Sequence, residues 1–245
     1  QYKYMQKLSH LINNAVSWLR TTSLPKSLNL PVDEIAKVLC YGDSNTWGYV
    51  PGTGKRYSFG SRWPGILQKQ LGRNVRVIEE GLNGRTTAWD DPLADGRNGK
   101  KSLKVILESH SPIDLLVIML GTNDLKHRFG LSAYDIAQGV GELVQMAKES
   151  DAGPARANPQ VLLVVPPRIL FLPGQTALDF EGALEKSGEL SVYYKSVAKH
   201  LGCACFDASA LVAGSPIDGV HLDKEAHRKL SKALTEVIEN LVSPP

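Results

Sequence analysis

The chain has little of several features that mark specialised classes of protein. It contains only three cysteines, it has no apolar run long enough to cross a bilayer, and its 28 basic residues are nearly balanced by 25 acidic ones. The basic residues are scattered among acids rather than grouped in a stripe, so nucleic acid is not expected as a partner. The missing apolar run gives no reason to expect a membrane span.

The few cysteines also bear on compartment and cofactors. Cys40, Cys203 and Cys205 lie inside apolar, strand-like runs. Buried, reduced thiols favour a reducing compartment and therefore a cytoplasmic location, although a chain that begins at Gln1 leaves a removed leader open. Cys203 and Cys205 lie in a strand-like run rather than at the spacing of a ligand-bearing loop, which argues against a metal site. We expect neither a metal nor an organic cofactor.

The 245 residues have the composition of an ordinary globular protein, and the chain is expected to have two parts. Residues 1–33 are predicted to be an amino-terminal helical extension, and residues 34–245 the main domain. Apolar residues recur every three or four positions from about Lys3 to Arg20, which is typical of an amphipathic helix. Packing on the domain, contact with a neighbouring subunit and docking on a membrane surface all remain open for this helix.

From Ile35 onward the sequence alternates between strand and helix patterns. The expected strands are Ala36–Tyr41, Val75–Glu79, Leu115–Leu120, Val161–Val165 and Ala204–Asp207. The expected helices are Arg62–Leu71, Leu103–Ser109, Ala133–Glu149, Leu184–Leu201 and Lys224–Leu241. Continuous apolar strands separated by amphipathic helices indicate a parallel sheet covered on both faces. The predicted class is α/β, a three-layer sandwich with about five strands.

The first strand ends at a candidate nucleophile. Ser44 follows an apolar run that stops at Gly42, which places it at the carboxyl edge of the sheet, where open α/β sheets bind ligands. Gly-Asp-Ser-Asn is also common turn and helix-capping composition, so a purely structural role stays open. Three long connections, 49–60, 85–101 and 166–181, are expected to hang over the same edge.

A candidate base and its orienting acid lie near the other end of the chain. Asp218 precedes His221 by three residues, just before the last predicted helix. One turn can bring the carboxylate to the imidazole, which is the arrangement that a general base needs beside a serine. The alternative is an ordinary loop turn, with Asp223 as the cap of the last helix in either case.

Two further strand ends supply candidate hydrogen-bond donors. Gly84 follows the second strand and allows a close approach of its backbone N–H to a ligand, and Asn123 follows the third strand. The backbone N–H groups of Ser44 and Gly84, with the side-chain amide of Asn123, would form a three-donor oxyanion hole. Trp47 is a candidate substrate-binding residue, and Tyr49 and Trp63 are further candidates for the walls of the site.

These segments resemble, in chain order, the four sequence blocks of the SGNH (GDSL-type) hydrolases. The blocks are Gly42-Asp43-Ser44-Asn45, Gly84, Gly121-Thr122-Asn123-Asp124 and Asp218-Gly219-Val220-His221. The resemblance implies a flavodoxin-like parallel sheet and ester hydrolysis, with Ser44 as nucleophile, His221 as base and Asp218 as orienting acid. Ser44, Gly84 and Asn123 would be the oxyanion donors.

Within the family the chain is most similar to the arylesterase and acyltransferase (perhydrolase) branch, from which it departs at Gly84, where that branch has alanine. The resemblance implies a serine esterase for small, short-chain aryl or alkyl esters, with possible acyl transfer, and a homo-oligomer. Two alternatives stay open: a carbohydrate O-acetylesterase, and a non-catalytic flavodoxin-like binding or assembly module.

Overall fold

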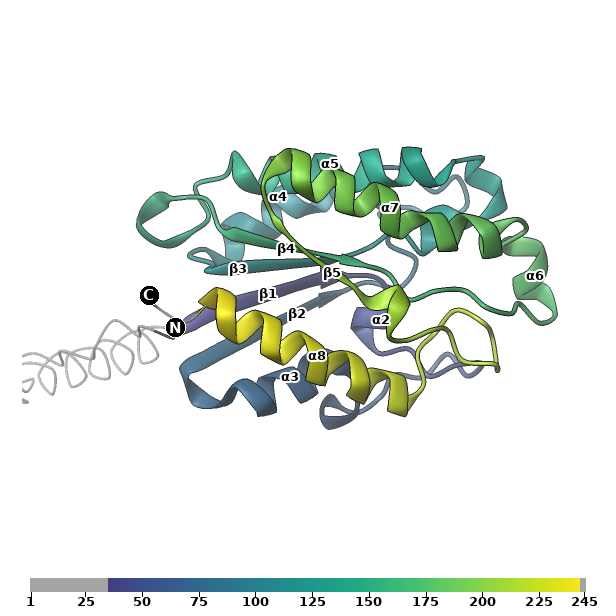
Figure 1. Cartoon of the computed structure of the whole chain (residues 1–245), viewed down its shortest axis with the longest axis horizontal. Helices are drawn as coiled ribbons and strands as arrows, with labels where there is room; N and C mark the ends of the chain where they lie inside the picture. The colour runs from purple at the N-terminus through teal and green to yellow at the C-terminus, as the bar shows by residue number, and fades with distance from the viewer. Residues whose placement is uncertain (1–34, 243–245) are drawn as a thin grey trace, which may run out of the picture. The chain divides into compact units, whose positions relative to one another are not determined.

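A parallel sheet of five strands organises the chain. The computed structural model describes residues 35–242. The strands are β1 (Ala36–Gly42), β2 (Val75–Gly81), β3 (Leu115–Met119), β4 (Gln160–Val165) and β5 (Ala204–Asp207). They lie side by side in the order β2-β1-β3-β4-β5, and every neighbouring pair is parallel (Figure 1).

Helices cover both faces of this sheet. One face carries α4 (Gly99–His110), α5 (Ala133–Lys148) and α7 (Ala183–Leu201), and the other carries α3 (Trp63–Leu71) and α8 (Lys224–Val242), as Figure 1 shows. Two short helices, α2 (Ser44–Trp47) and α6 (Gln175–Asp179), follow β1 and β4. Single turns of 3₁₀-helix span Phe59–Ser61, Gly72–Asn74, Asn123–Leu125, His127–Phe129, Pro154–Arg156 and Ala208–Ala210. The predicted three-layer α/β class is confirmed.

The apolar character of β1 follows from its position in the middle of the sheet. Leu39 and Tyr41 pack into the core beneath α4, α5 and α7, whereas Val38 and Cys40 pack into the second core beneath α3 and α8. All four side chains are fully buried. A strand that is covered on both faces needs apolar residues at successive positions, which explains the continuous run in the sequence.

The strand order places the candidate residues together. Since β1 pairs with β2 on one side and with β3 on the other, the segments that leave these three strands emerge next to one another. Ser44 follows β1, Gly84 follows β2 and Asn123 follows β3. Parallel strands end at the same edge, and the crevice beyond that edge is where α/β proteins of this kind bind ligands.

Most predicted boundaries agree with the observed ones to within two residues, with α4 as an exception. The periodicity predicts a start at Leu103, but the helix begins at Gly99 because the side chain of Asn98 accepts a hydrogen bond from the Lys101 N–H and caps it. The short helices α2 and α6 were not predicted. The amphipathic helix expected from about Lys3 to Arg20, and with it the boundary of the amino-terminal extension, lies outside the described residues.

Candidate functional site

Ser44 lies at the first position of α2, immediately beyond β1. Asp43 caps this short helix by accepting a hydrogen bond from the Asn45 N–H at 2.9 Å. Gly81, at the end of β2, lets α2 pack closely, since a Cβ there would lie 2.2 Å from the backbone nitrogen of Trp47. The start of a helix leaves its first N–H groups without intrahelical partners. The hydroxyl and the N–H of Ser44 are therefore both presented at the edge of the sheet.

A continuous relay of hydrogen bonds joins Ser44 to two residues near the end of the chain. His221 Nε2 lies 3.0 Å from Ser44 Oγ, and His221 Nδ1 lies 2.8 Å from Asp218 Oδ2. The carboxylate fixes the tautomer in which Nε2 can accept the proton of the hydroxyl. Residues 177 positions apart in the sequence thus form the serine, histidine and aspartate arrangement that sequence reasoning predicted.

The Asp218 carboxylate is held by four donors. Its Oδ1 accepts from the N–H groups of Val220 at 3.1 Å and His221 at 2.9 Å, and its Oδ2 accepts from the Gly52 N–H at 3.1 Å as well as from the imidazole. Partial burial raises the pKa of this carboxyl, but the hydrogen bonds from the His221 ring and backbone outweigh burial and lower it overall. Asp218 is therefore held in its ionised form.

The loop that carries His221 is fixed by two residues from the segment after β1. Asn45 donates from Nδ2 to the Val220 carbonyl at 3.2 Å and accepts at Oδ1 from the Leu222 N–H at 2.9 Å. The ring of Tyr49 stacks on the imidazole with centroids 4.1 Å apart. Asn45 was not assigned a role from the sequence. Its position directly after the nucleophile, in a run with few apolar residues, was the only local pattern that could have pointed to one.

Ser44, Gly84 and Asn123, from which the oxyanion donors are predicted to come, all line one cavity. Asn123 donates from Nδ2 to the Arg85 carbonyl at 3.1 Å, which leaves its second amide hydrogen available. Gly84 has a φ of +78°, a conformation that favours glycine, and within residues 35–242 its N–H makes no backbone hydrogen bond. The guanidinium of Arg85 bonds the carbonyls of Gly42 and Glu80 and so ties the ends of β1 and β2 together.

Two buried carboxyl groups support this edge of the sheet. Burial raises the pKa of Asp43 to about 6, against the lowering effect of the Asn45 N–H and the charge of His221. Burial also raises the pKa of Asp124 to about 6, against its hydrogen bonds from Thr87. Asp124 accepts from the Thr87 N–H at 2.9 Å and from Thr87 Oγ1 at 2.6 Å, which fixes the turn containing Asn123 against the loop after β2. Asp124 thus has a structural role.

A cavity of about 410 Å³ opens over the relay. It is lined by Ser44, Tyr49, Gly52, Asn83, Gly84, Asn123, Lys126, Thr176, Asp179, Phe180, Asp218, Val220 and His221. Trp47 does not line this cavity: Arg56 stacks over its ring at 5.0 Å. Trp63 is fully buried in the core with Leu67 and does not form a wall of the site. Tyr49 is the one of the three expected aromatic residues that lines the cavity.

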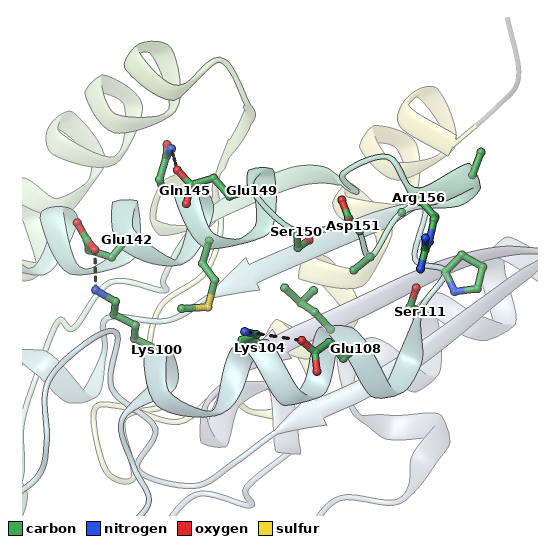
Figure 2. Close-up of a pocket in the computed structure, with 16 residues that line it drawn as sticks. Lys100, Lys104, Glu108, Ser111, Glu142, Gln145, Glu149, Ser150, Asp151 and Arg156 are labelled. Carbon is green, nitrogen blue, oxygen red and sulfur yellow. Dashed lines mark hydrogen bonds and ion pairs between the residues drawn. The ribbon is translucent and has the colours of Figure 1, made fainter.

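A larger hollow lies elsewhere, between α4 and α5 (Figure 2). It measures about 880 Å³, and ion pairs such as Lys100 with Glu142 at 2.7 Å line it. Its lining residues include Ser111 and Ser150 but no histidine, so it lacks the base that a serine nucleophile needs. Within residues 35–242 no group of three or more His, Cys, Asp or Glu side chains is gathered closely enough to bind a metal ion.

The strand-edge serine, the histidine and the aspartate define a serine-hydrolase type of site. Residues 40–229 match the model of the GDSL-like lipase/acylhydrolase family, and the chain belongs to this family. The predicted family resemblance is confirmed.

Several solved structures and one curated protein are similar to the chain. The aryl esterase of M. smegmatis is 39% identical with a TM-score of 0.81, and the match covers 84% of this chain and 100% of that one. A carbohydrate acetylesterase from Sinorhizobium meliloti is also 39% identical with a TM-score of 0.81, over 84% and 99%. An acetylxylan esterase of Xylanibacter ruminicola is 26% identical over 97% of this chain and 48% of its own length. The chain spans about half the length of that curated relative.

Proposed function

We propose that the chain is a serine esterase that hydrolyses small, short-chain esters through an acyl-serine intermediate. The observation that carries this proposal is the unbroken relay from Ser44 through His221 to Asp218, with distances of 3.0 and 2.8 Å. The family and the esterases among its relatives support the same reaction class.

The geometry supports a two-step mechanism. Ser44 Oγ attacks the ester carbonyl while His221 Nε2 takes its proton, and the N–H groups of Ser44, Gly84 and Asn123 stabilise the oxyanion. His221 then gives the proton to the leaving alcohol, and the acyl group stays on Ser44. In the second step His221 activates water, which releases the acid. An alcohol or a peroxide that enters the cavity in place of water would receive the acyl group, which is the proposed acyltransferase or perhydrolase reaction.

A carbohydrate O-acetylesterase is the second candidate. The cavity wall offers hydrogen-bonding side chains from Asn83, Thr176 and Asp179, which suit the hydroxyl groups of a sugar, beside the ring of Phe180. The family also includes relatives whose names state activity on acetylated carbohydrates. Faster hydrolysis of acetylated xylose than of phenyl acetate would favour this candidate.

Labelling by an organophosphate tests the enzyme directly. We expect the folded protein to gain one dialkylphosphoryl group on Ser44 with loss of the reagent's leaving group, located by peptide mass spectrometry, because His221 activates this hydroxyl. The matched control is Ser111, a serine in the hollow that lacks a histidine, which should stay unlabelled. Folded protein that is not labelled at Ser44 would instead support a non-catalytic module, with Ser44 and Asp218 only completing turns.

A variant of Asn45 tests how the base is positioned. Asn45→Ala removes both hydrogen bonds that flank His221, so we expect kcat to fall by roughly tenfold or more, since each buried hydrogen bond contributes about 1 kcal/mol. The loss should appear in kcat rather than KM, because Asn45 does not line the cavity. Asn158→Ala, an exposed change of the same kind, is the control. Unchanged kcat with intact folding would contradict the positioning role.

Assembly and location complete the proposal. We propose a homo-oligomer, supported by exposed apolar side chains close to the cavity: Phe171, whose backbone carbonyl approaches Gly219, is 59% exposed, and Ile217 is 63% exposed. Light scattering of the full chain measures this. A cytoplasmic location is supported by the three cysteines, all unpaired. Among the helices that the structure describes, none is both long and apolar enough to span a bilayer.

A further inference from the structure

Lys126 brings a cationic side chain to the wall of the catalytic cavity. It follows the turn Asn123–Leu125 and lines the same cavity as Ser44 and His221. Its Nζ lies 5.8 Å from the centroid of the Phe180 ring. Within residues 35–242 no carboxylate oxygen lies within the 4.0 Å of an ion pair from this nitrogen. The ammonium group therefore faces the cavity without an anionic partner.

The backbone around Lys126 is fixed from both sides. The Lys126 N–H donates to the Asn123 carbonyl at 3.2 Å, directly behind the oxyanion donor. Lys186, on α7, donates from Nζ to the Leu131 carbonyl at 3.2 Å, and thereby fixes the far end of the same segment. The position of the Lys126 backbone is thus set before a substrate binds, which reduces the conformational entropy lost on binding.

The neighbouring basic side chains on this segment already have carboxylate partners. Arg128 makes two hydrogen bonds to the carboxylate of Asp91, at 3.0 and 2.7 Å. His127 lies 3.6 Å from the carboxylate of Glu181. Lys126 is the cation of this segment that is left without such a partner in the part of the chain described.

The surroundings of Lys126 make its charge costly. Burial, and next the positive charge of Arg128, lower the pKa of its ammonium, while Asp91 and Asp179 oppose the change. An ammonium that has lost part of its hydration and has no carboxylate at ion-pair distance is stabilised when an anionic ligand arrives. Asp179 also lines the cavity and lies close enough to act on this pKa, so its carboxylate repels an anion that binds at Lys126.

We propose that Lys126 binds an anionic group of the substrate, so that the enzyme prefers esters that carry a carboxylate close to the scissile bond. This inference rests on the proposed esterase function and names its substrate class. A cavity of about 410 Å³ admits a small ester of this kind together with its carboxylate. The Asn83 amide and the Thr176 hydroxyl, which line the same cavity, can donate to the remaining oxygen atoms.

The test compares esters that differ in charge but not in shape. One pair is the acetyl ester of 3-hydroxybenzoate and that of 3-hydroxybenzamide, which puts the charge on the alcohol side. The second pair is the 4-nitrophenyl monoester of glutarate and that of glutaramate, which puts it on the acyl side; enzyme-free rates are subtracted. We expect the full chain to show a kcat/KM about tenfold or more higher for the anionic member of at least one pair.

Variants of Lys126 and Asp179 should change the preference for the anionic ester in opposite directions. Lys126→Gln should lower kcat/KM for the preferred anionic ester by about 10- to 100-fold, mainly through KM, with a much smaller loss on its neutral partner. Lys126→Arg should retain part of the preference. Asp179→Asn should increase it, because a repelling carboxylate is removed. Lys104→Gln, the same change on an exposed lysine of α4, should leave both members of the pair unchanged.

The possible outcomes separate this inference from the proposed function. No preference for either anionic ester, a preference that survives Lys126→Gln, or an equal loss on both members of a pair would overturn the role of Lys126 while ester hydrolysis stands. No hydrolysis of any ester by the full chain would overturn the esterase itself. If acetylated sugars are hydrolysed faster than the anionic esters and Lys126→Gln lowers that rate, Lys126 recognises hydroxyl groups and the carboxylate proposal is wrong.

Discussion

Replacing Ser44 or His221 by alanine is expected to lower kcat for 4-nitrophenyl acetate by about 10⁴- to 10⁶-fold. Without Ser44 no acyl-enzyme can form, and without His221 the hydroxyl keeps its proton because no other side chain of residues 35–242 is hydrogen-bonded to it. His221 Nε2 is 3.0 Å from Ser44 Oγ, so each change breaks the same proton transfer. Steady-state kinetics on protein whose folding has been checked by circular dichroism measures the loss.

The double variant sharpens this result. Ser44→Ala combined with His221→Ala should be hardly slower than either single variant, because two residues that act as one unit lose their contribution together. His200→Ala, a change at an exposed histidine near the end of α7, is the matched control and should retain full activity. A double variant whose loss equals the product of the single losses would show that the two residues act independently, and the relay would be refuted.

The second large effect is expected at Asn123. Asn123→Ala should lower kcat by about 10²- to 10³-fold with little change in KM, because the amide stabilises the oxyanion of the transition state more than the ground-state carbonyl. Asn123→Asp should be at least as slow, since a carboxylate cannot donate and adds a negative charge where one develops. The kinetics of acyl-enzyme formation under single-turnover conditions measures the effect on chemistry alone.

The control for Asn123 comes from the same cavity. Asn83 has the same side chain and lines the same cavity, but it follows β2, whereas Asn123 follows β3. Asn83→Ala should therefore lower kcat much less than Asn123→Ala does. Asn123 also bonds the Arg85 carbonyl at 3.1 Å, so thermal unfolding of both variants must be compared. Equal losses in kcat for the two variants would indicate a general disturbance of the cavity and would remove Asn123 from the oxyanion hole.

The sheet and the relay were predictable because each depends on a strong local pattern. The central strands β1, β3 and β4 contain continuous apolar runs, as β1 illustrates with Val38 and Leu39 buried on opposite faces. Parallel strands end at one edge, so the polar residues that follow them meet there whatever their separation in the sequence. Ser44 and Asn123 could therefore be placed together without coordinates.

The direction of individual side chains was not predictable from pattern. Trp47 and Tyr49 are two residues apart on a short helix and the segment after it, and sequence does not tell which ring faces the base. In the structure Tyr49 stacks on His221, whereas Trp47 is covered by Arg56. Helix α2 was missed because four residues are too few to show a periodicity. Lys126 could not be assigned to a cavity wall from the sequence, since a single lysine in a loop carries no signal for one.

The two hydrogen bonds of Asn45 have a consequence for the growing chain. They join the segment after the first strand to a loop some 175 residues later. During synthesis the hydroxyl of Ser44 leaves the ribosome long before the imidazole of His221 can reach it, so we expect a nascent chain to be inert towards esters. The protein becomes able to hydrolyse esters only when the loop that carries His221 has packed against Asn45. The first appearance of esterase activity would therefore report when folding is complete.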